Sequence, residues 1–278
     1  MFVTADRLMS ANGGRAYHAV TFYWEGYTPH LLLYSLKERV IEELDLTSLS
    51  IGISDEQMCT GSFRGEMYRP CPFRRHVEGF DQCEFCSRTL IPIQKCLFDP
   101  ICDGEICGWD LCRREHSVYI AFYGEKAKVG MTSSVRISER LIEQGADAYI
   151  VAGTFPSRRA AREMEKRIGS GLGIPQTHRY IEILDELQFA PNFSLIDERA
   201  SVISSVLWEK FGLSPSPVTR LEGYPIAQPL DGKPVYTDVT GFHEGRIVGV
   251  KGKVILYRKD GIKALNIAAV PSRIVHVL

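Results

Sequence analysis

Eight cysteines lie between Cys59 and Cys112, and the rest of the 278-residue chain contains none. Thiolates bind zinc strongly, and structural zinc takes four thiolate or imidazole ligands in a tetrahedron. Cys83-x-x-Cys86 has the spacing that lets two thiolates hold one metal ion. The sequence therefore predicts one or two structural zinc ions, and the candidate ligands are Cys59, Cys71, Cys83, Cys86, Cys96, Cys102, Cys107 and Cys112.

The same cysteines leave three alternatives open. They can be ordinary buried thiols, disulfides, or ligands of an iron–sulfur cluster, which four thiolates also hold. Disulfides belong to oxidising compartments, and the segment from Met1 to Gly14 lacks the apolar core of a secretion signal. The spacing does not decide which cysteines share a site. A thiolate-rich, closed site has no open position for water, so we expect a structural rather than a catalytic metal.

A short series of elements follows the cysteines and positions further polar side chains. Residues 117–123 and 126–131 predict two strands, 135–144 a helix that ends at Gly145, and 148–155 a third strand. Ser157 is placed to cap a second helix, because its hydroxyl can accept from the first-turn N–H groups. The predicted order is β-β-α-β-α.

Motifs on these elements resemble the GIY-YIG endonuclease superfamily. They are Ser117-Val118-Tyr119, then Lys128-Val129-Gly130, then Arg140 on the first helix and Glu165 on the second. The predicted β-β-α-β-α order matches that fold, and the resemblance covers about a fifth of the chain. The stretch from Cys59 onward also looks like a prokaryotic branch of the superfamily that joins a cysteine-rich zinc-binding region to a divergent GIY-YIG-like segment.

The resemblance implies a divalent-metal-dependent phosphodiester hydrolase. It assigns Glu165 as ligand of one Mg²⁺ or Mn²⁺ ion and Arg140 as the phosphate contact. Tyr119 is the phenol that orients or deprotonates the nucleophile. Glu163, two residues before Glu165, is an alternative for the carboxylate.

Two positions depart from the superfamily pattern. Ser117 stands where the first motif has glycine, and Lys128 stands where the second has tyrosine. A lysine can bind phosphate as a point charge, so Lys128 remains a candidate catalytic residue. It can equally mark a site that binds nucleic acid without cutting it.

Charge is distributed unevenly in this part of the chain. Overall, 33 basic residues balance 34 acidic ones. Residues 117–180 contain ten Lys/Arg and six Asp/Glu, a net +4, whereas residues 181–210 contain two and six, a net −4. We expect the first block to face phosphates through Arg136, Arg158 and Arg162, although pairing with helix carboxylates explains these arginines equally well.

The length favours two or three domains, and we expect an α+β, multidomain protein. The predicted regions are a β-rich N-terminal region (1–58), a cysteine-rich zinc-binding module (59–116), a GIY-YIG-like domain (117–195), and a helix, linker and β-rich C-terminal region (196–278). The two terminal β-regions can form one discontinuous barrel or sandwich.

The expected function is interaction with DNA or RNA, with nuclease activity as its enzymatic form. The alternative is a zinc-stabilised nucleic-acid-binding protein, RNA foremost, whose nuclease fold is catalytically degenerate. Redox or sulfur chemistry in the cysteine region is a third hypothesis. No run reaches the ~18 apolar residues that span a bilayer, so we expect a cytoplasmic protein without a membrane partner. His178 and His243 are interpreted as structural or surface residues.

Overall fold

The computed structural model describes residues 15–88, 92–178 and 180–278. They form a strand-rich α+β structure, as expected, which divides into two compact units. The first unit takes in the chain up to Pro92 together with Tyr224–Ala227 and Gly232–Leu278. The second comprises Ile93–Gly223 and Gln228–Asp231. The cysteine-rich region 59–116 is therefore shared between the units, and residues 1–14 of the N-terminal region lie outside the described part.

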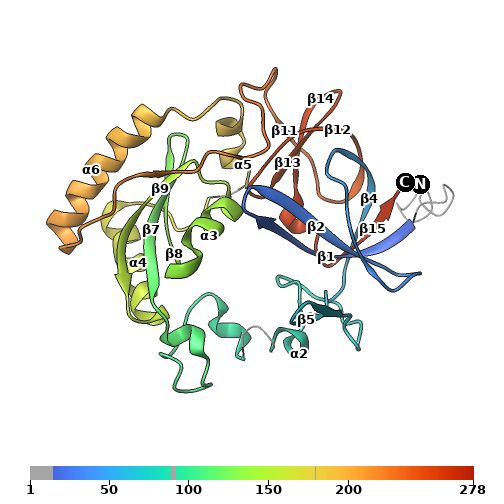
Figure 1. The fold of residues 1–278 in the computed structure, drawn as a ribbon, viewed down its shortest axis with the longest axis horizontal. Coiled ribbons are helices and arrows are strands. Elements are labelled where there is room, and N and C mark those ends of the chain that lie inside the picture. Colours follow the sequence, from blue (N-terminus) through green and yellow to red (C-terminus); the bar gives the residue numbers. More distant parts are fainter. Residues whose placement is uncertain (1–14, 89–91, 179) are drawn as a thin grey trace. The chain divides into compact units, whose positions relative to one another are not determined.

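One nine-stranded sheet dominates the first unit, and its spatial order is β11-β14-β13-β12-β4-β15-β1-β2-β3 (Figure 1). Both terminal regions of the sequence contribute strands, so they form a single sheet. The first four cysteines flank a two-stranded hairpin, β5–β6, or belong to the short helix α2 (Glu84–Ser87) and its N-cap. The strands of this unit are β1 (Arg15–Glu25), β2 (Thr28–Ser35), β3 (Ile41–Glu43), β4 (Ser48–Gln57), β5 (Ser62–Arg64), β6 (Met67–Arg69), β11 (Val235–Tyr236), β12 (Gly241–Lys251), β13 (Val254–Lys259), β14 (Gly261–Asn266) and β15 (Arg273–Val277).

The second unit contains a four-stranded sheet in the order β10-β9-β7-β8. Its strands are β7 (His116–Tyr123), β8 (Lys126–Ser133), β9 (Ala148–Phe155) and β10 (Thr219–Arg220). Its helices are α3 (Ile137–Gln144), α4 (Arg158–Leu172), α5 (Tyr180–Ile183) and α6 (Phe193–Phe211). The order β7-β8-α3-β9-α4 is the predicted β-β-α-β-α.

Strand β7 lies between β8 and β9 and is buried along its whole length. Successive side chains of a strand point to opposite faces. Val118, Ile120 and Phe122 join a core with residues of α4 and α6. Tyr119 and Tyr123 alternate with them, and their hydroxyls meet α3 at Gln144. The central strand thus supplies core packing on one face and polar groups on the other.

The helix ends follow the expected chemistry. Ser157 Oγ accepts from the Ala160 N–H at 3.2 Å and so caps α4. Gly145 ends α3 with φ +77°, a left-handed conformation that costs glycine little. The sequence predicts a helix from near Asp197 to Phe211. Helix α6 instead begins at Phe193, because the Asn192 side chain caps it by accepting from the Leu195 N–H.

In the C-terminal region, the sequence predicts a strand at residues 264–268. The structure instead has β14 ending at Asn266, followed by a 3-10 turn at Ile267–Ala269. Strand β15 was not predicted. It pairs with β1 and β4, which are distant in sequence, so no local pattern announces it. Among the described residues, no helix is both long and apolar enough to cross a membrane.

Candidate functional site

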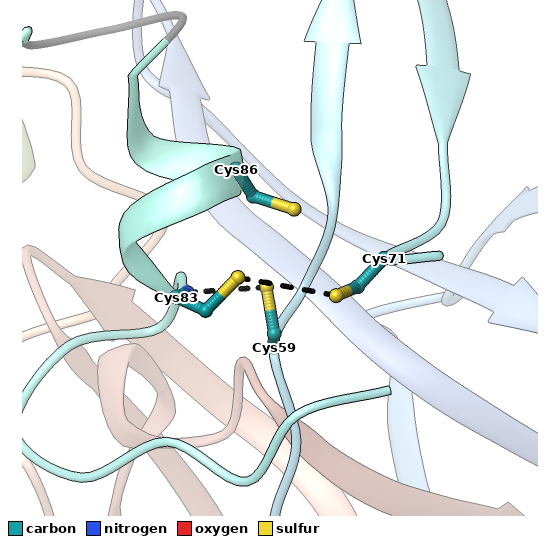
Figure 2. A group of neighbouring side chains, drawn as sticks. All are labelled: Cys59, Cys71, Cys83 and Cys86. Atoms are coloured by element: carbon teal, nitrogen blue, oxygen red, sulfur yellow. Dashed lines mark hydrogen bonds between the residues drawn. The ribbon is translucent and has the colours of Figure 1, made fainter. Parts of the chain in front are cut away.

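Four of the eight cysteines meet in the first unit. The sulfurs of Cys59, Cys71, Cys83 and Cys86 all lie within 4.8 Å of one another, and all four residues are buried. Figure 2 shows their side chains directed toward a common point. Cys83 and Cys86 come from the start and the body of α2, as the Cys-x-x-Cys spacing predicts, while Cys59 and Cys71 follow strands β4 and β6.

The backbone brings the two distant cysteines of this cluster together. Gly61 has φ +77°, and a Cβ at this residue would collide with the carbonyl oxygen of Arg69. Only glycine permits this close approach of the chain segments that carry Cys59 and Cys71. The Cys83 N–H donates to Cys59 Sγ at 3.2 Å, which fixes the start of α2 against the first sulfur.

The donor set fits a thiophilic metal ion. Zinc–sulfur bonds of about 2.3 Å place the sulfurs of a tetrahedron about 3.8 Å apart. Cys71 Sγ and Cys83 Sγ are 4.0 Å apart, so a shift of a few tenths of an ångström completes that edge. Four ligands from one buried cluster leave no coordination position for a substrate. The site is therefore compatible with structural zinc.

The thiols of this cluster differ in pKa. Burial raises the pKa of Cys59 to about 11 and the pKa of Cys86 further. Burial also raises the pKa of Cys71, but the backbone N–H groups of Arg75 and Phe73 and neighbouring thiols outweigh it and lower that pKa to about 7. Backbone donors thus favour a thiolate at Cys71, the form that a metal ligand takes.

The other four cysteines belong to the second unit. Cys96, Cys102 and Cys112 are buried and Cys107 is half-buried. No disulfide joins any of the eight cysteines, all of which the structure describes. In this part of the chain no three sulfurs approach as closely as those of the first group. Burial, with the nearby thiols of Cys102 and Cys107, raises the pKa of Cys112, which Arg158 partly offsets.

The residues named by the superfamily motifs come from three elements of the second unit. Tyr119 comes from β7, Arg140 from α3 and Glu165 from α4. Burial raises the pKa of the Tyr119 phenol to about 12, and the charges of both Arg140 and Glu165 act on it. Three elements that are separated in sequence therefore bring these side chains into one electrostatic neighbourhood.

Gln144 links two phenols in this neighbourhood. Its Oε1 atom accepts from the Tyr119 and Tyr123 hydroxyls, each at 3.3 Å. Gly130 on β8 leaves space for the Tyr119 ring, because a Cβ there would lie 2.5 Å from the hydroxyl oxygen. The glycine of the second motif is thus needed for packing against the tyrosine of the first.

Glu165 is an enclosed carboxylate, with 5% of the residue exposed. Arg162 Nη1 donates to its Oε2 atom at 2.6 Å and to Gln176 Oε1 at 3.0 Å. Burial raises the pKa of Glu165 and outweighs the opposite effects of Arg162, Lys128 and Lys166. Lys128 therefore lies near enough for its charge to lower the pKa of this carboxylate.

The remaining candidates lie in different surroundings. Glu163 is exposed and pairs with Arg159 at 3.1 Å, so Glu165 is the enclosed carboxylate of α4. Arg136 and Arg140 are both about half-exposed and pair with Glu143 at 3.0 Å. Arg158, expected to face phosphates, is instead buried. Its guanidinium lies over the Trp109 ring at 5.7 Å and beside Cys112.

Sequence reasoning did not select Tyr123 and Gln144 as site residues. Both follow simple periods: Tyr123 lies four residues after Tyr119 on the same strand face, and Gln144 one helical turn after Arg140. His178 packs against Tyr123 with ring centroids 6.0 Å apart and contacts the Ala127 carbonyl at 3.1 Å. His243, in the other unit, is buried between Tyr257 and the Val239 carbonyl.

The comparisons with known proteins give one match. A family model described as a protein of unknown function (DUF2797) matches residues 47–273, well over half of the chain. The chain matches neither a curated protein nor a solved structure.

Proposed function

The chain belongs to the DUF2797 family of proteins of unknown function, and we propose that it binds nucleic acid and hydrolyses a phosphodiester bond with a divalent cation. The observation that carries this proposal is that Arg140 and Glu165, from two other elements, lie near enough to Tyr119 for their charges to act on its phenol. Their types and order are those of the GIY-YIG superfamily, which the chain resembles in these motifs.

Each residue has a distinct role in the proposal. Glu165 would hold one Mg²⁺ or Mn²⁺ ion, which supplies charge stabilisation at the reacting phosphate. Hard cations bind carboxylate oxygens, and Glu165 is an enclosed carboxylate on which Arg162, Lys128 and Lys166 act. Arg140 is partly exposed and can reach a phosphate oxygen, while Lys128 contributes a point charge. The Tyr119 phenol, with its raised pKa, keeps its proton at neutral pH. It would orient the nucleophile by hydrogen bonding.

Two features favour the second candidate, binding without hydrolysis. Lys128 replaces a motif tyrosine, and Arg162 Nη1 occupies Glu165 Oε2 at 2.6 Å. A carboxylate held by arginine is a weaker site for a cation until that arginine moves to a phosphate. In this form the protein is a zinc-stabilised DNA- or RNA-binding protein with a degenerate nuclease fold.

Zinc is the metal we assign to Cys59, Cys71, Cys83 and Cys86. Support comes from the four sulfurs within 4.8 Å and from their burial without an open coordination position. Its role is to hold the segment between β4 and α2 in shape.

A cleavage assay with a matched pair of variants tests the hydrolytic proposal. The full-length protein is incubated with end-labelled branched and hairpin DNA and RNA and Mg²⁺ or Mn²⁺. We expect wild-type protein to nick at least one substrate. Glu165→Gln should give no product while retaining binding, because the change removes the negative charge and little volume. Glu163→Gln, two residues away on the exposed face of the same helix, should cleave like wild type.

Three results separate the alternatives. Product with wild type and Glu163→Gln, but not with Glu165→Gln, supports hydrolysis at this site. Salt-sensitive binding without product from any form supports the binding protein and overturns hydrolysis. Failure to bind any of these substrates at low salt overturns both.

A further inference from the structure

The loop from Ile93 to Glu115 in the second unit buries cysteine side chains and leaves three large apolar side chains exposed. Among the residues of this loop whose burial the structure describes, the buried ones are Cys96, Pro100, Cys102, Gly104 and Cys112. Three large apolar side chains of the same loop, Phe98, Ile101 and Ile106, are 66%, 60% and 61% exposed. Burial of cysteine is ordinary, but the hydrophobic effect favours burial of the three large apolar side chains as well.

The local backbone provides little stabilisation for this arrangement. Regular structure is limited to two 3-10 turns, Gln94–Leu97 and Asp110–Arg113, which contain Cys96 and Cys112. The Gly104 N–H donates to Cys102 Sγ at 3.4 Å, so the backbone of this turn is directed toward the sulfur. Individual hydrogen bonds of this kind contribute on the order of 1 kcal/mol, too little to order a loop of this length.

Despite that, the loop is anchored to α4. Arg158, the first residue of α4, lies beside Cys112 and over the Trp109 ring. Asp99 Oδ1 accepts from Lys166 Nζ at 2.7 Å and lies 3.5 Å from Arg162 Nε. The loop therefore makes specific contacts with the helix that carries Glu165.

We propose that Cys96, Cys102, Cys107 and Cys112 form a second tetrathiolate metal site, for zinc, within the second unit. The eight cysteines then divide in sequence order into four and four, one set in each unit. Binding would draw the second set to the sulfur separations of a tetrahedron, about 3.8 Å, and so order the loop between them. This inference does not depend on the proposed function.

Metal content of the full-length protein tests the site. Elemental analysis of wild-type protein should give about two zinc ions per chain. Cys102→Ser/Cys112→Ser should lower this to one, and so should the matched pair Cys83→Ser/Cys86→Ser in the first cluster. The two double variants remove equal numbers of sulfurs, so a similar loss from each indicates two independent sites.

A second measurement covers variants that fail to fold. Wild-type protein is treated with an alkylating reagent before and after zinc chelation, and each cysteine is followed by mass spectrometry. We expect at least a tenfold slower alkylation of Cys102, Cys107 and Cys112 before chelation, as metal-bound thiolates are protected.

Several results would overturn the second site. They are one zinc ion in wild-type protein, full zinc retention in Cys102→Ser/Cys112→Ser, or equal alkylation rates with and without chelator. Disulfides among these cysteines in freshly purified protein, or iron with acid-labile sulfide in place of zinc, would do the same.

Discussion

A substitution of Cys83 is the sharpest test of the zinc site proposed for Cys59, Cys71, Cys83 and Cys86. Replacing Cys83 by serine removes one sulfur from the four that lie within 4.8 Å and changes the side-chain volume little. The Cys83 N–H, which donates to Cys59 Sγ, is kept. We expect Cys83→Ser to lose the metal and to loosen residues 59–86, because the three remaining sulfurs no longer complete a tetrahedron.

The size of the effect follows from mass action. A ligand present at 1,000 times its dissociation constant stabilises the folded state by about 4 kcal/mol. Structural zinc sites bind tightly enough for that excess to be reached at micromolar zinc. Four kcal/mol corresponds to about a thousandfold change in the opening equilibrium of the segment that the metal closes.

Hydrogen exchange followed by mass spectrometry reads this segment separately from the second unit. In zinc-containing buffer, peptides that cover residues 59–86 should exchange up to about a thousandfold faster in Cys83→Ser than in wild type. Ser87→Ala is the matched control. It removes a buried hydroxyl from the same helix, whose hydrogen bond to the Glu84 carbonyl is 3.2 Å long, but no sulfur. Its exchange should stay within a few-fold of wild type.

The reasoning fails if Cys83→Ser and Ser87→Ala behave alike. It also fails if a chelator leaves the exchange of residues 59–86 in wild-type protein unchanged. Either result would mean that burial and hydrogen bonding hold the four thiols together without a metal.

Three further predictions concern the second unit. Because burial raises the pKa of Glu165, the contribution of this group to the stability of the metal-free protein should fall as the pH rises from the ordinary carboxyl pKa through the raised one. Glu165→Gln should remove this part of the pH dependence in urea unfolding from pH 4 to 8. Gln144→Leu deprives two buried hydroxyls of their acceptor and should cost about 1–3 kcal/mol in urea unfolding at pH 7, with no loss expected if water replaces the amide. Gly130→Ala places a Cβ 2.5 Å from the Tyr119 hydroxyl and should lower the free energy of unfolding by about 1–3 kcal/mol. Gly153→Ala, whose nearest neighbour is the flexible end of a leucine at 3.3 Å, should lower it by less. Equal midpoints of the two variants in thermal unfolding would refute the packing argument.

Local signals in the sequence predicted the second unit well. Gly145 and Ser157 ended and began helices as expected, since capping depends on hydrogen bonds within a few residues. The β-β-α-β-α order follows from the periodicity of each element. The order in space, with β10 beside β9 and α6 packed in the core, depends on contacts that no short window contains.

The division of the cysteines illustrates the other limit. Cys83 and Cys86 share a turn of helix, so their spacing alone predicts a common ligand pair. Cys59 joins them only because the chain returns past Gly61, where Arg69 approaches too closely for any side chain. Nothing in the spacing of the eight cysteines marks the boundary near Pro92 that separates one set from the other.

The burial of Arg158 changes how the charge of α4 is interpreted. A count of basic residues assigns this arginine to phosphate binding. Its guanidinium instead lies over the Trp109 ring and beside Cys112, both in the loop from Ile93 to Glu115. Lys166 and Arg162 are both engaged by Asp99 of the same loop, and Arg162 also pairs with Glu165. Much of the positive charge on this helix is therefore matched by nearby carboxylates. If the protein binds nucleic acid as proposed, a phosphate in the site competes with Asp99 and Glu165 for Arg162. The loop from Ile93 to Glu115 then helps to set the local charge of that site.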